Sequence, residues 1–219
     1  MDRLEQIVDL IEFEECLADV GCDHGYVGLE LFKKGKIKKL IATDISADCL
    51  EKSNLLFADK PYDYEGRVGD GLKPIEKAEA DALVIAGMGG DLIAKIVCAD
   101  EEKTKSLKKF IIQPMTEPEK VRKTFYDLGF TRTQDLIVKE KKHYYFVMVF
   151  ELLDTEDQAE EDYTYTKLLQ AHPLFKDYIN HEIRKRKNII NEIKTKSGKD
   201  NAAIMEKENE IKELERFEN

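Results

Sequence analysis

Residues 17–26 read LADVGCDHGY, and residues 40–45 read LIATDI. The first apolar segment runs into Asp19 and then into a glycine-containing turn, and the second apolar segment ends in the carboxylate of Asp44. A strand, a turn and a helix, followed by a second strand that ends in an acid, build a nucleotide-shaped crevice at the carboxyl end of a parallel sheet. Asp44 is placed to accept hydrogen bonds from two ribose hydroxyls.

The turn after the first strand indicates a ligand without phosphate. A dinucleotide site has the spacing G-x-G-x-x-G, which seats a pyrophosphate on a helix N-terminus. This turn reads D-x-G-x-D-x-G, with Gly21 and Gly25 allowing close approach of a ligand and Asp23 standing where the middle glycine would be. A carboxylate there repels pyrophosphate and suits a cationic or zwitterionic ligand such as S-adenosylmethionine. The alternative is a plain strand-turn-helix with structural glycines.

Composition narrows the class of protein. The chain has 219 residues, 42% of them hydrophobic, and a net charge of −10. No apolar run approaches the roughly 20 residues of a membrane span, and the N-terminus shows no secretory pattern. The four cysteines form no C-x-x-C pair, so we expect no metal and a cytoplasmic location. The acidic balance counts against a general nucleic-acid coat, although a local basic face can still bind RNA.

Alternating strand-like and helix-like periods over residues 1–153 predict an α/β domain. The last part of this domain is similar to the way in which Rossmann-like methyltransferases close their sheets. Two extended runs, 130–139 and 143–153, are expected to form a hairpin that adds one antiparallel strand, giving a mostly parallel seven-stranded sheet. The other expected strands are 16–20, 40–43, 65–68, 82–86 and 110–113, and the expected helices are 2–11, 26–34, 47–58, 91–97 and 118–127.

A second domain is expected beyond this sheet. Residues 154–162 are an acidic linker, and residues 163–219 show apolar side chains at intervals of three and four. A break at 197–200 predicts a coiled-coil-like helical hairpin.

Further candidate residues follow the third, fourth and fifth expected strands. Asp70 could accept from the exocyclic amine of an adenine, or could be a turn acid between glycines. Residues 86–90, AGMGG, face the transferable methyl group but lack the [D/N]-P-P-[Y/F] motif of exocyclic-amine methyltransferases. Because the protein lacks the hydrogen-bond acceptors of that motif, we favour a substrate whose methyl-accepting atom has a free in-plane lone pair, such as a ring nitrogen. Gln113 could read a base edge or satisfy loop backbone, and a lone residue such as His24 is more often structural than catalytic.

Several of these segments together resemble the bacterial TrmK family, the tRNA (adenine-22 N1)-methyltransferases. The resemblance spans essentially the whole chain. It departs from the family at Gly25, where members often have alanine, at Thr43-Asp44, where they often have Gly-Glu, and at Met115, where they often have asparagine. The segments that carry it are 18–26, 69–72, 85–90, 112–114 and the lysine-rich stretch before Tyr144.

This resemblance implies S-adenosylmethionine as cofactor, tRNA as substrate and N1-methyladenosine as product. It places Asp23 and Tyr26 near the acceptor base as the candidate catalytic residues. The candidate cofactor-binding residues are Asp19, Gly21, His24, Gly25, Asp44, Ile45, Asp70, Gly71, Ala86, Gly87 and Met88. The candidate substrate-binding residues are Gly89, Gly90, Gln113, Arg184, Lys185, Arg186 and Lys187.

The last four of these residues form a basic run on one arm of the expected hairpin, and such a run can grip RNA phosphates. The alternative is a solvated helix face balanced by ion pairs within the hairpin. A methyltransferase of another substrate and a non-catalytic cofactor-binding module are the competing functions. The protein is expected to be a monomer or a weak dimer with no membrane association.

Overall fold

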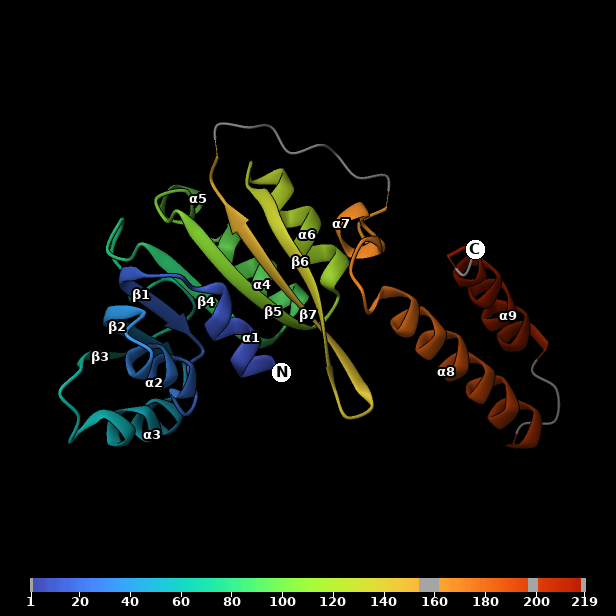
Figure 1. The fold of residues 1–219 in the computed structure, drawn as a ribbon, viewed down its shortest axis with the longest axis horizontal. Coiled ribbons are helices and arrows are strands. Elements are labelled where there is room, and N and C mark those ends of the chain that lie inside the picture. The colour runs from blue at the N-terminus through green and yellow to red at the C-terminus, as the bar shows by residue number, and fades with distance from the viewer. Residues whose placement is uncertain (1, 154–161, 197–200, 218–219) are drawn as a thin grey trace. The chain divides into compact units, whose positions relative to one another are not determined.

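A computed structural model describes residues 2–153, 162–196 and 201–217. Its strands form one sheet of seven in the order β3-β2-β1-β4-β5-β7-β6 (Figure 1). β7 runs antiparallel to both of its neighbours, whereas the remaining neighbouring pairs are parallel. The predicted fold class is therefore confirmed. The strands are β1 (Glu14–Val20), β2 (Ile37–Asp44), β3 (Asp63–Val68), β4 (Ala82–Gly89), β5 (Lys109–Thr116), β6 (Thr131–Glu140) and β7 (His143–Glu151).

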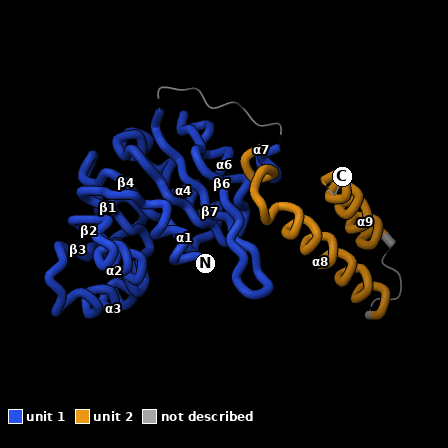
Figure 2. The backbone as a smooth tube through the Cα atoms, viewed as in Figure 1, with its two compact units in different colours: residues 1–166 blue, residues 167–219 orange. Residues whose placement is uncertain are grey.

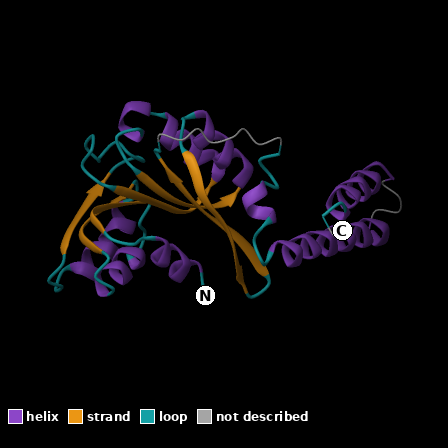
Figure 3. Ribbon diagram, turned by 45° about the horizontal axis from the view of Figure 1, so that its top comes forward, coloured by secondary structure: helices purple, strands orange, loops and turns teal. Residues whose placement is uncertain are grey.

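Helices cover both faces of this sheet (Figures 1 and 3), with α1, α2 and α3 on one face and α4, α5 and α6 on the other. Helix starts follow local capping chemistry. Asp2 and Glu5 form a capping box at the start of α1, and the Ser46 hydroxyl accepts from the amide of Cys49 at the start of α3. The six helices are α1 (Arg3–Leu10), α2 (Tyr26–Lys33), α3 (Ala47–Phe57), α4 (Gly90–Cys98), α5 (Glu101–Thr104) and α6 (Pro118–Asp127).

The central strands are apolar without interruption because both of their faces are covered. Residues 82–85 of β4 and 110–112 of β5 are fully buried. β4 differs from the expectation at its end, because pairing with β5 continues through Met88 and Gly89, with a register shift on either side of Met88. The expected connection at 87–90 is therefore an irregular strand end that leads directly into α4.

The chain divides into two compact units, Met1–Thr166 and Lys167–Asn219 (Figure 2). We predicted a first domain ending at 153, a linker over 154–162 and a hairpin from 163. Residues 154–161 of that linker lie outside the described residues, whereas residues 163–166 belong to the first compact unit.

A fully buried ion pair holds residues 163–166 in place. The guanidinium of Arg122 donates to both carboxylate oxygens of Asp135 over 2.8 and 3.1 Å. The same guanidinium donates to the carbonyls of Tyr163 and Thr164, while the Thr166 hydroxyl donates to Asp135 over 3.1 Å. One charge pair thus ties α6, β6 and the end of the first unit together.

The second unit consists of α7 (Lys167–Gln170), α8 (Phe175–Lys196) and α9 (Asn201–Glu215). The rings of Phe175, at the start of α8, and Phe217, just after α9, meet edge to face with centroids 5.4 Å apart, so the two long helices run antiparallel. The expected break at 197–200 lies outside the described residues. None of the described helices is both long and apolar enough to cross a membrane.

We predict that Asp135→Ala lowers the free energy of unfolding by about 3–5 kcal/mol, because it leaves the buried Arg122 charge unpaired. The control is Asp127→Ala, which breaks an exposed pair with Lys123 on α6 and should change that free energy by less than about 0.5 kcal/mol. Urea unfolding followed by circular dichroism measures both. Equal effects in the two variants would contradict the anchoring role of Asp135.

Candidate active site

The carboxyl ends of β1, β2 and β3 bring three predicted acids to one edge of the sheet. Val20 is level with Thr43 on β2, and Asp44 is level with Val68 on β3. Asp19 and Asp44 therefore lie close to each other, and Asp70 follows β3 at the same edge. This arrangement is the crevice expected from the sequence.

A cavity of about 240 Å³ opens at this edge between the β1–α2 turn, the end of β4 and the start of α1. Eight of the predicted site residues line this cavity, so the structure brings these eight together. Those eight are Asp19, Gly21, Asp23, His24, Tyr26, Ala86, Gly87 and Gln113, and the lining is completed by Arg3, Leu4, Ile7, Cys22 and Val27.

Asp19 is the most unusual group of this cavity. Its side chain is 4% exposed, and its Oδ2 atom has no hydrogen-bond partner among the described residues. Burial, and secondarily the nearby charge of Asp44, raises the pKa of Asp19 to about 7. A buried carboxylate oxygen without a partner is costly, so the site fits a cationic ligand group such as an ammonium.

Asp44 is held in place by backbone amides at the end of β2. Its Oδ1 accepts from the amide of Ser46 over 2.8 Å, and its Oδ2 accepts from the amide of Asp23 over 3.4 Å. The carboxylate is only partly buried, so lone pairs remain for a ligand. Ile45 follows with 72% of its side chain exposed, which leaves an apolar surface beside this acid.

The β1–α2 turn depends on residues with positive φ. Gly21 has a φ of +74°, and a Cβ there would lie 2.0 Å from the terminal methyl of Met88. Gly25 has a φ of +72°, and a Cβ there would meet the hydroxyl of Ser53 at 2.4 Å. Asp23 adopts a φ of 44° without being glycine, a conformation that costs free energy and is common at binding sites.

The three polar side chains of this turn point into solvent at the cavity. Asp23 pairs with Lys52 at 3.2 Å and contacts His24 at 3.5 Å. The ring of His24 stacks on the ring of Tyr26 with centroids 5.4 Å apart, and Tyr26 is 54% exposed. An exposed aromatic pair beside a carboxylate is a suitable platform for a flat base.

The glycines after β4 differ in what they do. Gly87 has a φ of +79° and open space around it, so the backbone is accessible from the cavity. A Cβ at Gly89 would lie 3.1 Å from the Thr116 hydroxyl, and one at Gly90 would lie 2.4 Å from the backbone carbonyl of Glu117. Gly90 therefore has a packing reason to be glycine that is independent of any substrate.

Arg3 was missed by the sequence reasoning. It reaches the cavity from the start of α1, where its guanidinium donates to the side-chain oxygen of Gln113 over 3.3 Å and to Glu140 over 3.2 Å. Gln113 is 2% exposed and donates in turn to the carbonyl of Pro114. The only sequence signal for Arg3 is its place one residue after the capping Asp2, which does not predict a contact with β6.

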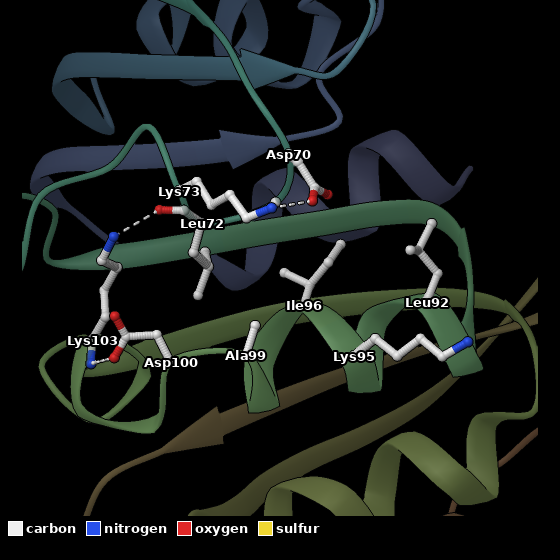
Figure 4. A pocket seen from close by; sticks show the side chains of 10 residues that line it. Asp70, Leu72, Lys73, Leu92, Lys95, Ile96, Ala99, Asp100 and Lys103 are labelled. Atoms are coloured by element: carbon white, nitrogen blue, oxygen red, sulfur yellow. Dashed lines mark hydrogen bonds and ion pairs between the residues drawn. The ribbon is translucent and has the colours of Figure 1, made fainter.

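Asp70 and Gly71 line a second hollow of about 410 Å³ beside α4 (Figure 4). Lys73 donates to Asp70 over 2.7 Å, and Lys103 donates to the carbonyl of Leu72 over 3.2 Å. Apolar side chains from one side of α4 form its floor, and the sequence reasoning did not single them out. They are Leu92, Ile96 and Ala99.

The predicted basic run lies on α8 of the second unit. Arg184, Lys185 and Lys187 are exposed, and Lys185 is 3.8 Å from Glu182. Arg186 differs, because its guanidinium contacts Glu182 on α8 and Glu210 on α9 and is only 20% exposed. The ion-pair alternative therefore describes Arg186, whereas the other three side chains remain accessible.

Similarity to known proteins assigns this chain to a family. Residues 1–148 match the family described as "Methyltransferase domain". The chain belongs to the methyltransferase domain family. Of the described residues, none form a group of three or more His, Cys, Asp or Glu side chains that could hold a metal ion.

Individual relatives support the resemblance seen in the sequence. A Bacillus subtilis protein named tRNA (adenine(22)-N(1))-methyltransferase is 32% identical over 161 residues, which cover 70% of this chain and 66% of that protein. The structure of Mycoplasma capricolum TrmK with S-adenosyl-homocysteine has a TM-score of 0.81 at 22% identity, covering 98% of this chain and 96% of that one. A Streptococcus pneumoniae protein solved with S-adenosyl-L-methionine has a TM-score of 0.80 at 25% identity, covering 98% and 99%. These matches confirm the similarity to the TrmK family.

We predict that the free energy of unfolding of this ligand-free methyltransferase decreases as the pH rises from about 4 to about 7, and that Asp19 causes the decrease. Its pKa is raised from 3.8 to about 7, so the folded state keeps a proton that the unfolded chain releases over this range. Asp19→Asn removes the titration and should make the unfolding free energy at pH 8 higher than in the wild type.

Urea unfolding at pH 5 and pH 8 measures this effect, with Asp48→Asn on the exposed start of α3 as the control. Parallel pH dependences for the wild type and Asp19→Asn would show that the buried acid does not titrate there.

Proposed function

We propose that this methyltransferase uses S-adenosylmethionine to methylate N1 of adenine 22 in the D-arm region of tRNA. The observation that carries the proposal is the buried Asp19 carboxylate, which lines a cavity at the carboxyl edge of the sheet and has an oxygen without a partner among the described residues. Asp44 lies close to it but outside the lining of that cavity. This pair suits a ligand that combines an ammonium with a ribose. The relative that is 32% identical carries the name of this activity.

In this proposal each of the three acids binds a different part of the cofactor. Asp19 accepts a hydrogen bond from the methionine ammonium, because a positive charge is stabilised most beside a buried carboxylate oxygen that has no partner among the described residues. Asp44 accepts from the ribose hydroxyls with the lone pairs that Ser46 and Asp23 leave free. Asp70 accepts from the exocyclic amine of the adenine, for which it must give up its exposed pair with Lys73.

When bound, S-adenosylmethionine supplies a methyl group already activated by the adjacent sulfonium. Adenine N1 has a free lone pair, so no residue has to remove a proton before attack. The protein's contribution is then to position the base and to exclude water. Tyr26 stacks on the base, and Asp23 stabilises the positive charge that N1-methyladenine carries at neutral pH.

The acceptor base must leave the RNA stack to reach this cavity, because N1 lies on the edge used for pairing. We assign the grip on the tRNA backbone partly to the accessible cations Arg184, Lys185 and Lys187 of α8. A monomeric or weakly dimeric state and a cytoplasmic location are part of the same proposal.

The decisive test is methylation of unmodified tRNA transcripts with labelled S-adenosylmethionine, followed by nucleoside analysis. We expect N1-methyladenosine from a transcript with adenine at position 22 and no label in the same transcript with guanine there. Label in both transcripts would assign another position, and label in neither would reject tRNA as the substrate.

We predict that Asp44→Ala weakens binding of S-adenosylmethionine by about 1.5–3 kcal/mol, since charged hydrogen bonds to two hydroxyls are lost. The control is Asp48→Ala, which removes an exposed carboxylate four positions along the chain. Calorimetric titration measures both affinities. An unchanged affinity in folded Asp44→Ala would reject the ribose assignment.

A further inference from the structure

The β6–β7 hairpin extends beyond the parallel part of the sheet (Figure 1). Pairing between β5 and β7 ends at Ile112 and Met148, whereas β6 and β7 continue to pair as far as Glu140 and His143. Since β7 is antiparallel to β5, its first residues lie past the carboxyl end of β5. The tip of the hairpin therefore projects from the edge of the sheet that carries the cofactor cavity.

Arg3 joins this tip to the cavity. Its guanidinium stacks on the ring of Tyr145 at 4.1 Å from the ring centroid and binds Glu140. The same side chain lines the cavity and donates to Gln113. A separate hollow of about 690 Å³ lies at the tip and is lined by Asp2, Glu140, Tyr145 and three cationic or titratable residues, namely Lys139, Lys141 and His143.

The charge of the tip is positive on balance. Lys139, Lys141, Lys142 and His143 are exposed. The acids beside them already have partners, because Glu140 binds Arg3 and the Asp2 carboxylate is held by the amide of Glu5 at the α1 cap. The tip therefore offers several cations, with the aromatic rings of Tyr144 and Tyr145 among them, on an otherwise acidic chain.

We infer that the tip of the β6–β7 hairpin, residues 139–145, together with Arg3, binds the sugar-phosphate backbone of the RNA next to the nucleotide whose base enters the cavity. The inference rests on the proposed tRNA substrate and adds a contact on the catalytic unit itself. Lysines on a strand ribbon neutralise phosphates. The guanidinium of Arg3 already stacks on Tyr145, and Lys139 lies over the ring of Tyr144, so we assign the RNA contact to the charges of the tip and not to base stacking. An extruded base leaves its two neighbouring phosphates at the mouth of the cavity, where the tip begins.

The test is the double variant K141Q/K142Q in the full-length chain, compared with K105Q/K108Q. The control lysines are exposed and precede β5, so they lie at the opposite edge of the sheet, and the charge change is the same. Binding is measured at several salt concentrations with complete tRNA and with a short stem-loop that contains the target adenine. Binding of S-adenosylmethionine to both variants reports that the cofactor site is intact.

We expect K141Q/K142Q to weaken binding of both RNAs about tenfold and to reduce the slope of log affinity against log salt by about 1.5, as two phosphate contacts are lost. K105Q/K108Q should match the wild type. A loss of affinity for complete tRNA alone would place these lysines on a distant part of the tRNA and overturn the inference. Equal binding by the two variants, while the wild type methylates tRNA, would also overturn it and leave the proposed function standing. Absence of any tRNA binding by the wild type would reject both.

Discussion

Parallel strands that end at a common edge crowd their carboxylates, and this crowding is the constraint on which the site depends. Asp19 is buried against Asp44 and keeps an oxygen without a described partner. The turn beside this pair adds a cost of its own, because Asp23 adopts a positive φ without being glycine. The crevice therefore lowers the stability of the fold, and the buried apolar strands beneath it compensate for this loss.

The acids of the crevice were predictable because each apolar run in the sequence ends at a definite residue. Asp44 is the last residue of its strand and Asp19 the last but one of its own, so the apolar runs that precede them were enough to place both acids near the carboxyl edge of the sheet. The family resemblance then supplied the proposed roles of the aromatic and acidic residues in the first turn. The alternation of strands and helices and the final hairpin predicted a mostly parallel sheet of seven strands with one antiparallel strand, whereas the order of the strands comes from the structure.

Other features could not be read from the sequence because they depend on contacts between distant segments. Arg3 meets Glu140 across 137 positions of the chain, and nothing local to either residue indicates it. The packing of residues 163–166 depends on the buried Arg122 and Asp135, which look in the sequence like ordinary surface charges. Gly90 lies against the carbonyl of Glu117, so its small size reflects packing that only the register of β4 and β5 reveals.

The register of β7 divides this strand into two parts that have different neighbours. Its later half is the antiparallel member of the sheet and is locked between β5 and β6, while its first residues pair with β6 alone. In the outer ribbon that these residues form, the turn at residues 141–143 is exposed throughout, whereas Val138 and Val147 behind it belong to the core and Glu140 and Tyr145 hold Arg3. Insertions, deletions and charge changes confined to that turn should therefore leave the core strands folded. The turn is the part of the catalytic unit on which selection can adjust substrate range while the methyl-transfer chemistry stays the same.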